Sequence, residues 1–362
     1  MSVFQGMKNK GITLDYTLPG EPSDEVKSVV ASIRLDQRLY ALQLKRFFLG
    51  SIGSSYARLG DFAKASLYLN ADAFKDAQIA WFGEIWNGRT SCDEINVVQQ
   101  SHYGETLCNF VMLRLLDAAP FKVNFFCCHR MAEVVEKCFP GIRVVVCDFS
   151  DYKREVCRIV AGSSNPTTAL IPAHHALARH LSFTKIPYPI VTPLSCDIEE
   201  YKALFAPQEI AAIKIALCWK CGLKDSPRSF CASDLEPLLS IKNAKFISLQ
   251  KGEPSGEVYR TAIAERLISN QKEVDRMTSF YSTLLVAKFA DVLITCDTSV
   301  AHLAGISGVP CLLLLAPNHD QRWGDHYLYP PYPSVRILRK SGGCSWRLFM
   351  EGLARDLAVH FL

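Results

Sequence analysis

The chain contains the stretch Asp291-Val-Leu-Ile-Thr-Cys-Asp-Thr-Ser-Val-Ala-His-Leu-Ala-Gly-Ile-Ser-Gly-Val-Pro310, which decides the fold. Its apolar run at 292–295 predicts a buried strand, and the segment 300–306 predicts a helix that ends at Gly308. A second apolar run at 311–315 predicts another strand. A strand, a helix and a strand in this order form a unit with parallel strands, so the stretch predicts an α/β fold.

The turn between that strand and that helix has the properties of an anion site. Thr298 or Ser299 begins the helix and is expected to cap it. Free N–H groups at a helix start, together with the positive end of the helix dipole, attract a diphosphate. Asp297 ends the strand, and His302 lies about one turn into the helix, where it can face the same ligand. The alternative is an ordinary capped helix in which Asp297 and His302 satisfy only local hydrogen bonds.

The alternation of strands and helices continues on both sides of this stretch. The Pro-rich segment 186–194 interrupts it and marks a domain boundary. We therefore predict two Rossmann-like domains, at 91–195 and 196–345, and a C-terminal helix at 346–362. Ligands of open α/β folds bind at the carboxyl ends of the strands, so we expect a cleft between the two sheets. Further strands are predicted at 95–98, 122–127, 142–146, 169–171, 214–219 and 244–249, and further helices at 105–116, 131–138, 279–289 and 345–362.

The first part of the chain follows a different pattern. Residues 24–90 carry apolar side chains at helical spacing. Around Gly60-Asp61 the spacing resembles one tetratricopeptide-like helical hairpin, and the alternative is an unrelated hairpin. A single hairpin cannot bury its own apolar face. We therefore expect residues 1–90 to form a helical appendage that packs on the next domain, on a protein partner or on a second copy in a homo-oligomer.

Composition argues against several classes of protein. The net charge is only +4 over 362 residues, with Lys and Arg scattered along the chain, so no concentrated basic face for nucleic acid is expected. No apolar run approaches the roughly 20 residues that span a bilayer. Residues 1–20 lack the apolar core of a secretory signal, so we expect a cytoplasmic protein. The 14 cysteines are then best explained as reduced core residues.

Several short segments follow one another in an order that a known family shares. They are Lys214-Ile-Ala-Leu-Cys-Trp219, Arg228-Ser229, Phe246-Ile-Ser-Leu-Gln-Lys-Gly252, Arg322-Trp323, Tyr332-Pro333-Ser334-Val335-Arg336 and Trp346. With 291–310 they resemble the heptosyltransferase family and the tetratricopeptide-linked bacterial glycosyltransferases, both of the GT-B fold. The resemblance is close over 214–362 and thinner over 95–195. It implies two Rossmann-like domains, of which the C-terminal one holds a nucleotide-sugar donor.

The same resemblance implies the members of the donor site. They are Asp297, Thr298, Ser299 and His302, with Arg228, Gln250 and Lys220 as outer members. The two cations also make chemical sense without the resemblance, because a diphosphate leaving group gains negative charge as the glycosidic bond breaks. Arg228 and Lys220 supply positive charge without a metal ion, and the alternative for each is an ordinary surface cation.

A candidate catalytic base lies in the segment Gln99-Gln-Ser-His-Tyr-Gly-Glu-Thr-Leu-Cys108. The family usually has Gly-x-Gly-Asp here, and its Asp is the proposed base. This chain has Ser101 or His102 near the first glycine position and Glu105 in place of the Asp. Glu105 keeps a carboxylate that can take the proton of an acceptor hydroxyl, with His102 as the rival base. The alternative is that Glu105 only favours the helix N-terminus electrostatically.

Three cysteines in and after the strand predicted at 214–219 have part of the pattern of a metal site. Cys218 and Cys221 have a spacing that suits zinc, and Cys231 follows, but no fourth ligand is near and Cys218 falls in a predicted buried strand. We therefore predict no metal and no cofactor. The aromatic residues that either line a sugar or base pocket or pack within the domain are Trp323, Tyr327, Tyr329 and Tyr332.

Together these features predict an enzyme. It is an inverting, metal-independent glycosyltransferase of the hexosyl- or heptosyltransferase type, which moves a sugar from a nucleotide diphosphate sugar to an acceptor hydroxyl. Acceptors in the family range from lipid-linked saccharides to protein side chains. One alternative is a non-catalytic binding or scaffold module built on a degenerate transferase, which the altered Gly-x-Gly-Asp segment permits. Another is a GT-B-like sugar epimerase, which would need further acid/base residues beside the donor.

Overall fold

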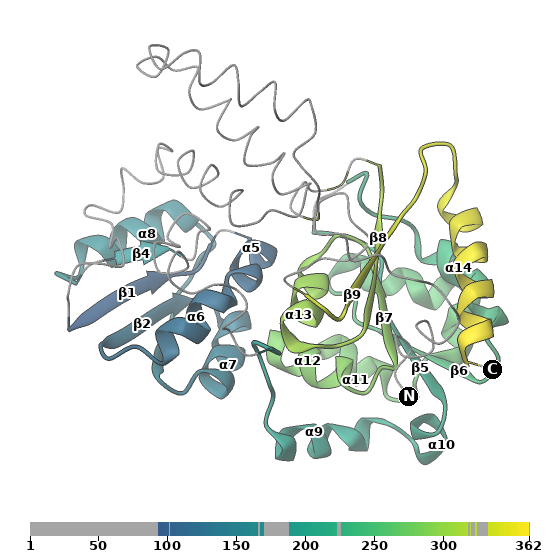
Figure 1. Ribbon diagram of the computed structural model, residues 1–362, viewed down its shortest axis with the longest axis horizontal. Helices are drawn as coiled ribbons and strands as arrows, with labels where there is room; N and C mark the ends of the chain where they lie inside the picture. Colours follow the sequence, from purple (N-terminus) through teal and green to yellow (C-terminus); the bar gives the residue numbers. More distant parts are fainter. Residues whose placement is uncertain are drawn as a thin grey trace, which may run out of the picture. The chain divides into compact units, whose positions relative to one another are not determined.

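The computed structural model describes residues 93–100, 102–165, 167–169, 188–222, 226–317, 319, 323 and 332–361 (Figure 1). These residues fall into two compact units, and the chain passes from one to the other between Ile190 and Val191. We call residues 93–190 the N-terminal unit, and residues 191–319 with 332–361 the C-terminal unit. The helical appendage expected at 1–90 lies outside the described residues.

The N-terminal unit contains a four-stranded parallel sheet in the order β3-β2-β1-β4. The predicted strands are confirmed, although the last begins at Thr167 rather than at 169, because the sheet pairs Asn96 of β1 with Thr167. Ile95 and Val97 are fully buried, as expected of a strand covered on both faces. The elements are β1 (Glu94–Val98), α5 (Tyr103–Cys108), α6 (Phe110–Asp117), β2 (Lys122–Cys127), α7 (His129–Cys138), β3 (Ile142–Val146), α8 (Tyr152–Ala161) and β4 (Thr167–Ala169).

The helix predicted at 105–116 is two helices, α5 and α6, which meet at Asn109. The Asn109 side chain donates a hydrogen bond to the Glu105 carbonyl over 2.7 Å, and its backbone N–H bonds the Thr106 carbonyl over 3.2 Å. An asparagine side chain that bonds the preceding turn competes with the helical backbone pattern. The prediction of one continuous helix was wrong for this local reason.

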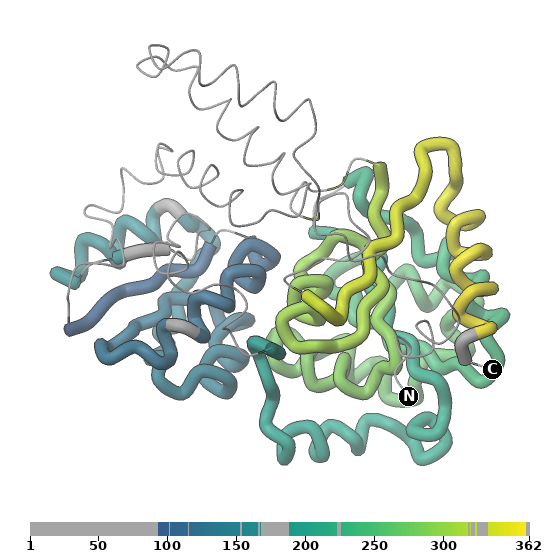
Figure 2. The backbone as a smooth tube through the Cα atoms, viewed as in Figure 1, coloured from purple at the N-terminus to yellow at the C-terminus, as the bar shows by residue number. Residues whose placement is uncertain are grey.

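The C-terminal unit contains a five-stranded parallel sheet in the order β6-β5-β7-β8-β9 (Figures 1 and 2). Four of these strands were predicted; β9 was not. The strands are β5 (Ile213–Cys218), β6 (Ala244–Ser248), β7 (Val292–Thr295), β8 (Cys311–Leu315) and β9 (Val335–Arg339). The helices are α9 (Ser195–Tyr201), η5 (Lys202–Leu204), α10 (Pro207–Ile210), η6 (Ala232–Ser240), η7 (Glu253–Arg260), η8 (Ala262–Arg266), α11 (Gln271–Arg276), α12 (Phe280–Ala287), α13 (Ser299–Ser307) and α14 (Trp346–Phe361), with η for 3-10 helices.

The predicted ends of two helices in this unit are confirmed. The Ser279 hydroxyl caps α12 by accepting a hydrogen bond from the Ser282 N–H over 3.0 Å. Gly308 ends α13 with φ of 73°, in the left-handed region that favours glycine. Both ends follow from single residues, so the sequence alone was sufficient to place them.

The main core of the C-terminal unit lies on one face of its sheet. Alternate residues of the strands point to this face, where η6 and α14 cover them; both lie on the same side of the sheet in Figure 1. On α13 every residue from Val300 to Ser307 is buried, so this helix is enclosed on all sides rather than amphipathic. The core residues from strands and covering helices include Ile215, Leu217, Val292, Ile294, Leu312, Leu314, Leu235, Leu238, Met350 and Leu357.

The strand order of the C-terminal sheet identifies where a ligand can bind. From β5 the chain crosses to β6 on one side, and from β6 it crosses back over β5 to β7 on the other side. The connections therefore diverge beyond the carboxyl ends of β5 and β7, which is the topological switch point of a doubly wound sheet. The residues that follow these two strands are Trp219 and Cys296 onward.

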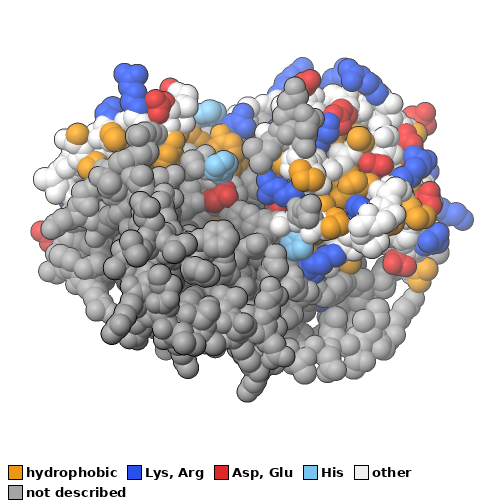
Figure 3. Space-filling view, turned by 90° about the horizontal axis from the view of Figure 1, so that it is seen from above, with side chains coloured by type: hydrophobic (Ala, Val, Ile, Leu, Met, Phe, Trp, Pro, Cys, Tyr) orange, Lys and Arg blue, Asp and Glu red, His pale blue; other side chains and the backbone are white. Residues whose placement is uncertain are grey.

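The surface shows charges of both signs. In the space-filling view, Lys and Arg side chains alternate with Asp and Glu side chains over the described part of this face (Figure 3). Such mixing is typical of a solvated surface. No helix in the described part of the chain has the length and apolar character to cross a bilayer.

Candidate functional site

The loops after β5 and β7 meet at the switch point. Cys296 donates its N–H to the Cys218 carbonyl over 3.0 Å, which continues the pairing of the two strands past their last residues. The Cys218 thiol lies 3.9 Å from the Thr298 hydroxyl. Residues from 218 to 220 and from 296 to 299 therefore line the same edge of the sheet.

The start of α13 is partly exposed and lacks a side-chain cap. Thr298 is the N-cap residue, but its hydroxyl makes no capping hydrogen bond. That hydroxyl lies 3.1 Å from the Thr295 hydroxyl instead. The expected side-chain cap is therefore not formed. Of the N–H groups in the first turn, that of Ala301 donates to the Thr298 carbonyl over 3.1 Å. Thr298 and Ser299 are partly exposed, whereas the rest of the helix is buried.

An ion pair lies directly before this helix. The Arg228 guanidinium donates from Nη1 to Asp297 Oδ2 over 3.0 Å. Asp297 is 5% exposed and Arg228 is partly exposed, so the carboxylate is buried and the cation reaches toward solvent. The family resemblance predicted both residues as members of a donor site. Their ion pair shows how a residue from the loop after β5 is fixed beside β7.

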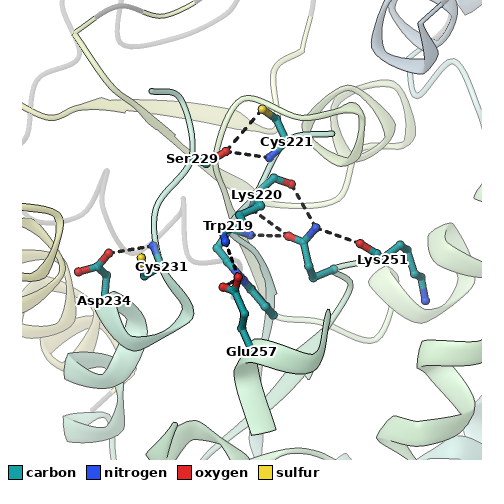
Figure 4. A network of polar contacts seen from close by, with 9 residues as sticks. Trp219, Lys220, Cys221, Ser229, Cys231, Asp234, Lys251 and Glu257 are labelled. Carbon is teal, nitrogen blue, oxygen red and sulfur yellow. Dashed lines mark hydrogen bonds and ion pairs between the residues drawn. The ribbon is translucent and has the colours of Figure 1, made fainter. Parts of the chain in front are cut away.

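Gln250, which follows β6, fixes the backbone of the loop after β5. Its Oε1 accepts from the Trp219 N–H over 3.1 Å and from the Lys220 N–H over 2.8 Å. Its Nε2 donates to the Lys220 carbonyl over 3.2 Å and to the Lys251 carbonyl over 3.4 Å. Figure 4 shows this network around Trp219, Lys220 and Lys251. Gln250 is buried, and its geometry favours shaping this loop over direct contact with a ligand.

Lys220 pairs with a residue that sequence reasoning missed. Its ammonium bonds Oε1 of Glu257 in η7, while Oε2 of the same carboxylate accepts from the Trp219 indole Nε1 over 3.1 Å (Figure 4). The hydrogen bond to Glu257 is the main cause of a raised Lys220 pKa. Nothing in the sequence distinguishes Glu257 from the neighbouring Glu253, because only the folded arrangement brings Glu257 to Lys220.

His302 is buried among local partners. Its Nδ1 lies 3.1 Å from the Tyr332 hydroxyl, and the two rings meet edge to face with centroids 5.8 Å apart. His302 and Tyr332 are each 2% exposed. This geometry favours the local-hydrogen-bond interpretation for His302, and packing rather than a pocket role for Tyr332. The Tyr332 ring also rests against Gly305, where an added Cβ would lie 2.3 Å from Cδ2.

The candidate base lies in the N-terminal unit. Glu105 is partly exposed in the first turn of α5, and His102 is exposed at the N-cap position without a side-chain cap bond. The Thr106 hydroxyl accepts from the Gln100 N–H over 3.0 Å and holds the loop in place. The two candidates are three residues apart around one helix start, as the sequence required.

This loop is fixed to the sheet by Gln99. Its Oε1 accepts from the Cys128 N–H over 2.8 Å, and its carbonyl accepts from the Tyr152 hydroxyl over 2.8 Å. Cys128 follows β2, so Gln99 joins the ends of two neighbouring strands. Gln250 does the same in the C-terminal unit. In each unit, a glutamine after one strand accepts backbone hydrogen bonds from the loop after a neighbouring strand, from one N–H in the case of Gln99 and from two in the case of Gln250.

The three cysteines whose spacing suits zinc, Cys218, Cys221 and Cys231, have separate environments. Cys218 is buried at the end of β5, and burial raises the pKa of its thiol to about 11. Cys221 is partly exposed beside the Ser229 hydroxyl, and Cys231 is exposed. Among the described residues, no three or more His, Cys, Asp or Glu side chains gather in a metal-binding arrangement.

Comparison with known proteins identifies the fold. Neither a protein-family model nor a curated protein sequence matches the chain. Among solved structures, the Escherichia coli ADP-heptose LPS heptosyltransferase II is similar with a TM-score of 0.51 and 13% identity, over 74% of this chain and 99% of that one. The E. coli heptosyltransferase WaaC, solved with ADP, has a TM-score of 0.50 and 10% identity, over 74% of this chain and 99% of that one. The chain therefore has the GT-B fold of these glycosyltransferases.

Proposed function

With this fold as the premise, we propose that the protein is a glycosyltransferase that takes a sugar from a nucleotide diphosphate sugar and passes it to an acceptor hydroxyl. One observation carries the proposal: α13 begins without a side-chain cap at the switch point, beside the Arg228 guanidinium. Helix N–H groups and a fixed cation together attract a diphosphate. The similar structure of WaaC was solved with ADP, which contains such a diphosphate.

The donor site would be built in two layers. Thr298 and Ser299 would offer backbone N–H groups to the diphosphate, and Arg228 and Lys220 would supply positive charge. Asp297 would orient Arg228, and Gln250 would hold the loop that carries Lys220. His302 would support the start of α13 from within the unit. These seven residues form the proposed donor site.

The chemistry follows from what the leaving group needs. As the glycosidic bond breaks, its electron pair passes to the diphosphate, and the cations with the helix N–H groups stabilise that charge. The acceptor hydroxyl attacks the anomeric carbon from the opposite face and loses its proton to a base, so the configuration inverts. We propose Glu105 as this base and His102 as its rival. The cations make a metal ion or other cofactor unnecessary.

A change at the start of α13 tests the proposal. Thr298→Glu puts an anion where the diphosphate would bind, so sugar-nucleotide affinity should fall at least tenfold, which is about 1.4 kcal/mol. The measurement is the thermal shift of the full chain with ADP-, UDP-, GDP- and dTDP-sugars. Ser345→Glu is the matched control, because Ser345 begins α14 in the same unit. Unchanged affinity in Thr298→Glu would contradict the proposal.

The altered Gly-x-Gly-Asp segment keeps a second function open, namely a binding or scaffold module without catalysis. Glu105→Gln distinguishes the two. An enzyme should retain donor binding and lose transfer, whereas a module shows no turnover even in the parent protein. An epimerase would need free acid/base groups beside the donor. The acids there, Asp297 and Glu257, are bound to Arg228 and Lys220, and this supports transfer instead.

The remaining partners are proposed by class. The acceptor is a saccharide, a lipid-linked saccharide or a protein side chain. The segment 1–90 is the candidate contact with a protein partner or with a second copy of the chain. We also propose a cytoplasmic location, without a nucleic-acid partner.

A further inference from the structure

The carboxylate of Glu257 binds two donors from consecutive residues of the loop after β5. Its Oε1 bonds the Lys220 ammonium, and its Oε2 accepts from the Trp219 indole over 3.1 Å. Glu257 belongs to η7, which follows β6, so the carboxylate comes from a different crossover than its two partners. Figure 4 shows Trp219 and Glu257 directed toward each other.

The bond to Trp219 does not depend on Lys220. Trp219 is fully buried, and its N–H donates to Gln250 Oε1 over 3.1 Å, so its ring and its backbone are both fixed. A fixed indole N–H holds Glu257 Oε2 in place when Oε1 loses its partner. The carboxylate can therefore release the ammonium without moving itself.

The bond to Lys220 is the exchangeable one. The two side chains are 32% and 29% exposed, so water screens their attraction. A diphosphate carries more negative charge than one carboxylate and competes for the same ammonium. Lys220 lies two residues after the end of β5, at the edge of the sheet where the diphosphate is proposed to bind.

We propose that Glu257 is a positioning residue that holds the Lys220 ammonium while the site is empty, yields it to a diphosphate, and takes it back when the diphosphate leaves. This inference rests on the proposed function and deepens it, because it assigns one residue the task of limiting how tightly the spent nucleoside diphosphate is held. The ligand class is a diphosphate, whether free or within a nucleotide.

Titration of the full-length protein with inorganic pyrophosphate tests the exchange directly. Glu257→Gln keeps an acceptor for the Trp219 indole and removes the competing charge. We expect this variant to bind pyrophosphate about two- to fivefold more tightly than the parent, by calorimetry at low salt. In a Lys220→Met background the same change should have no effect. Equal or weaker binding by Glu257→Gln, or an equal gain without Lys220, overturns the inference.

Glu253→Gln is the matched control. Glu253 is exposed in the same 3-10 helix and also raises the Lys220 pKa through its charge, as the last of several causes. The Glu253→Gln substitution removes one negative charge without removing a bond to Lys220, so pyrophosphate affinity should stay at the parent value. A gain equal to that of Glu257→Gln would show long-range repulsion and refute an exchange.

Two further measurements keep the result interpretable. Thermal unfolding checks that Glu257→Gln is folded, and Glu257→Asp, which keeps the charge, should bind pyrophosphate like the parent. A parent protein that binds pyrophosphate but no sugar nucleotide would reject the proposed function and leave the exchange intact. A parent that transfers sugar, with Glu257→Gln unchanged toward pyrophosphate, would reject the exchange and leave the function intact.

Discussion

Replacing Gln250 by Leu removes the acceptor on which the loop after β5 depends. Leu is similar in size, but it leaves the N–H groups of Trp219 and Lys220 without the oxygen that they bond over 3.1 and 2.8 Å. Each buried, unsatisfied donor costs about 1–3 kcal/mol. Because Leu is more apolar than Gln, its burial offsets about 1–2 kcal/mol of this loss. Two such donors together cost about 4 kcal/mol at the middle of that range, so we expect a net loss of about 2–3 kcal/mol in the free energy of unfolding.

Gln271→Leu provides the comparison within the same unit. The Gln271 Oε1 accepts only one backbone N–H, that of Ser248, over 2.9 Å. With one lost donor against the same gain from burial of Leu, its replacement should cost only about 0.5 kcal/mol in urea unfolding. Because the loop that Gln250 holds carries Lys220, pyrophosphate affinity should fall in Gln250→Leu and stay unchanged in Gln271→Leu. A midpoint for Gln250→Leu equal to that of the parent would refute this account of the loop.

Two further predictions concern packing and pH. Gly305→Ala gains about 1 kcal/mol of helix propensity, but its Cβ meets the buried Tyr332 ring at 2.3 Å. We therefore expect a net loss of up to about 2 kcal/mol in the free energy of unfolding, measured in urea. A Gly305→Ala/Tyr332→Leu double variant should relieve this clash. A double variant no more stable than Gly305→Ala would contradict the clash. The Cys218 thiol has a folded pKa of about 11, above its unfolded value, so the folded state keeps a proton that the unfolded state loses. Stability should therefore fall relative to Cys218→Ala as pH rises from about 8.5 to 11, by up to about 3 kcal/mol, and parallel pH curves for the two proteins would count against it.

Local sequence was sufficient wherever one segment fixes its own structure. The stretch 291–310 specifies a strand, a turn, a helix and its end, because apolar runs and Gly308 act within a few residues. Prediction from local sequence failed where a distant partner or a single side chain determines the structure. Asn109 divides the helix predicted at 105–116 through its own amide. Strand β9 exists because β8 pairs with it, from Cys311 with Val335 onward, and no local signal had predicted it.

The candidate site divides in the same way. Its residue types could be inferred from the sequence, because a helix start after a buried strand with cations nearby suits a diphosphate. The partners that those residues bind could not be inferred from the sequence, because the contacts join segments far apart in the chain. Arg228 meets Asp297 across 69 positions, and Lys220 meets Glu257 across 37.

Local patterns in the sequence predicted most of the strands and helices, because these depend on hydrogen bonds and apolar spacing within a few residues, but they also predicted a side-chain cap at the start of α13 that is not formed. Only the tertiary structure decided that the β5 and β7 loops share one edge of the sheet, that Gln250 serves the backbone, and that Glu257 holds Lys220. Those pairings depend on how parallel strands align in space, and alignment is a property of the folded sheet.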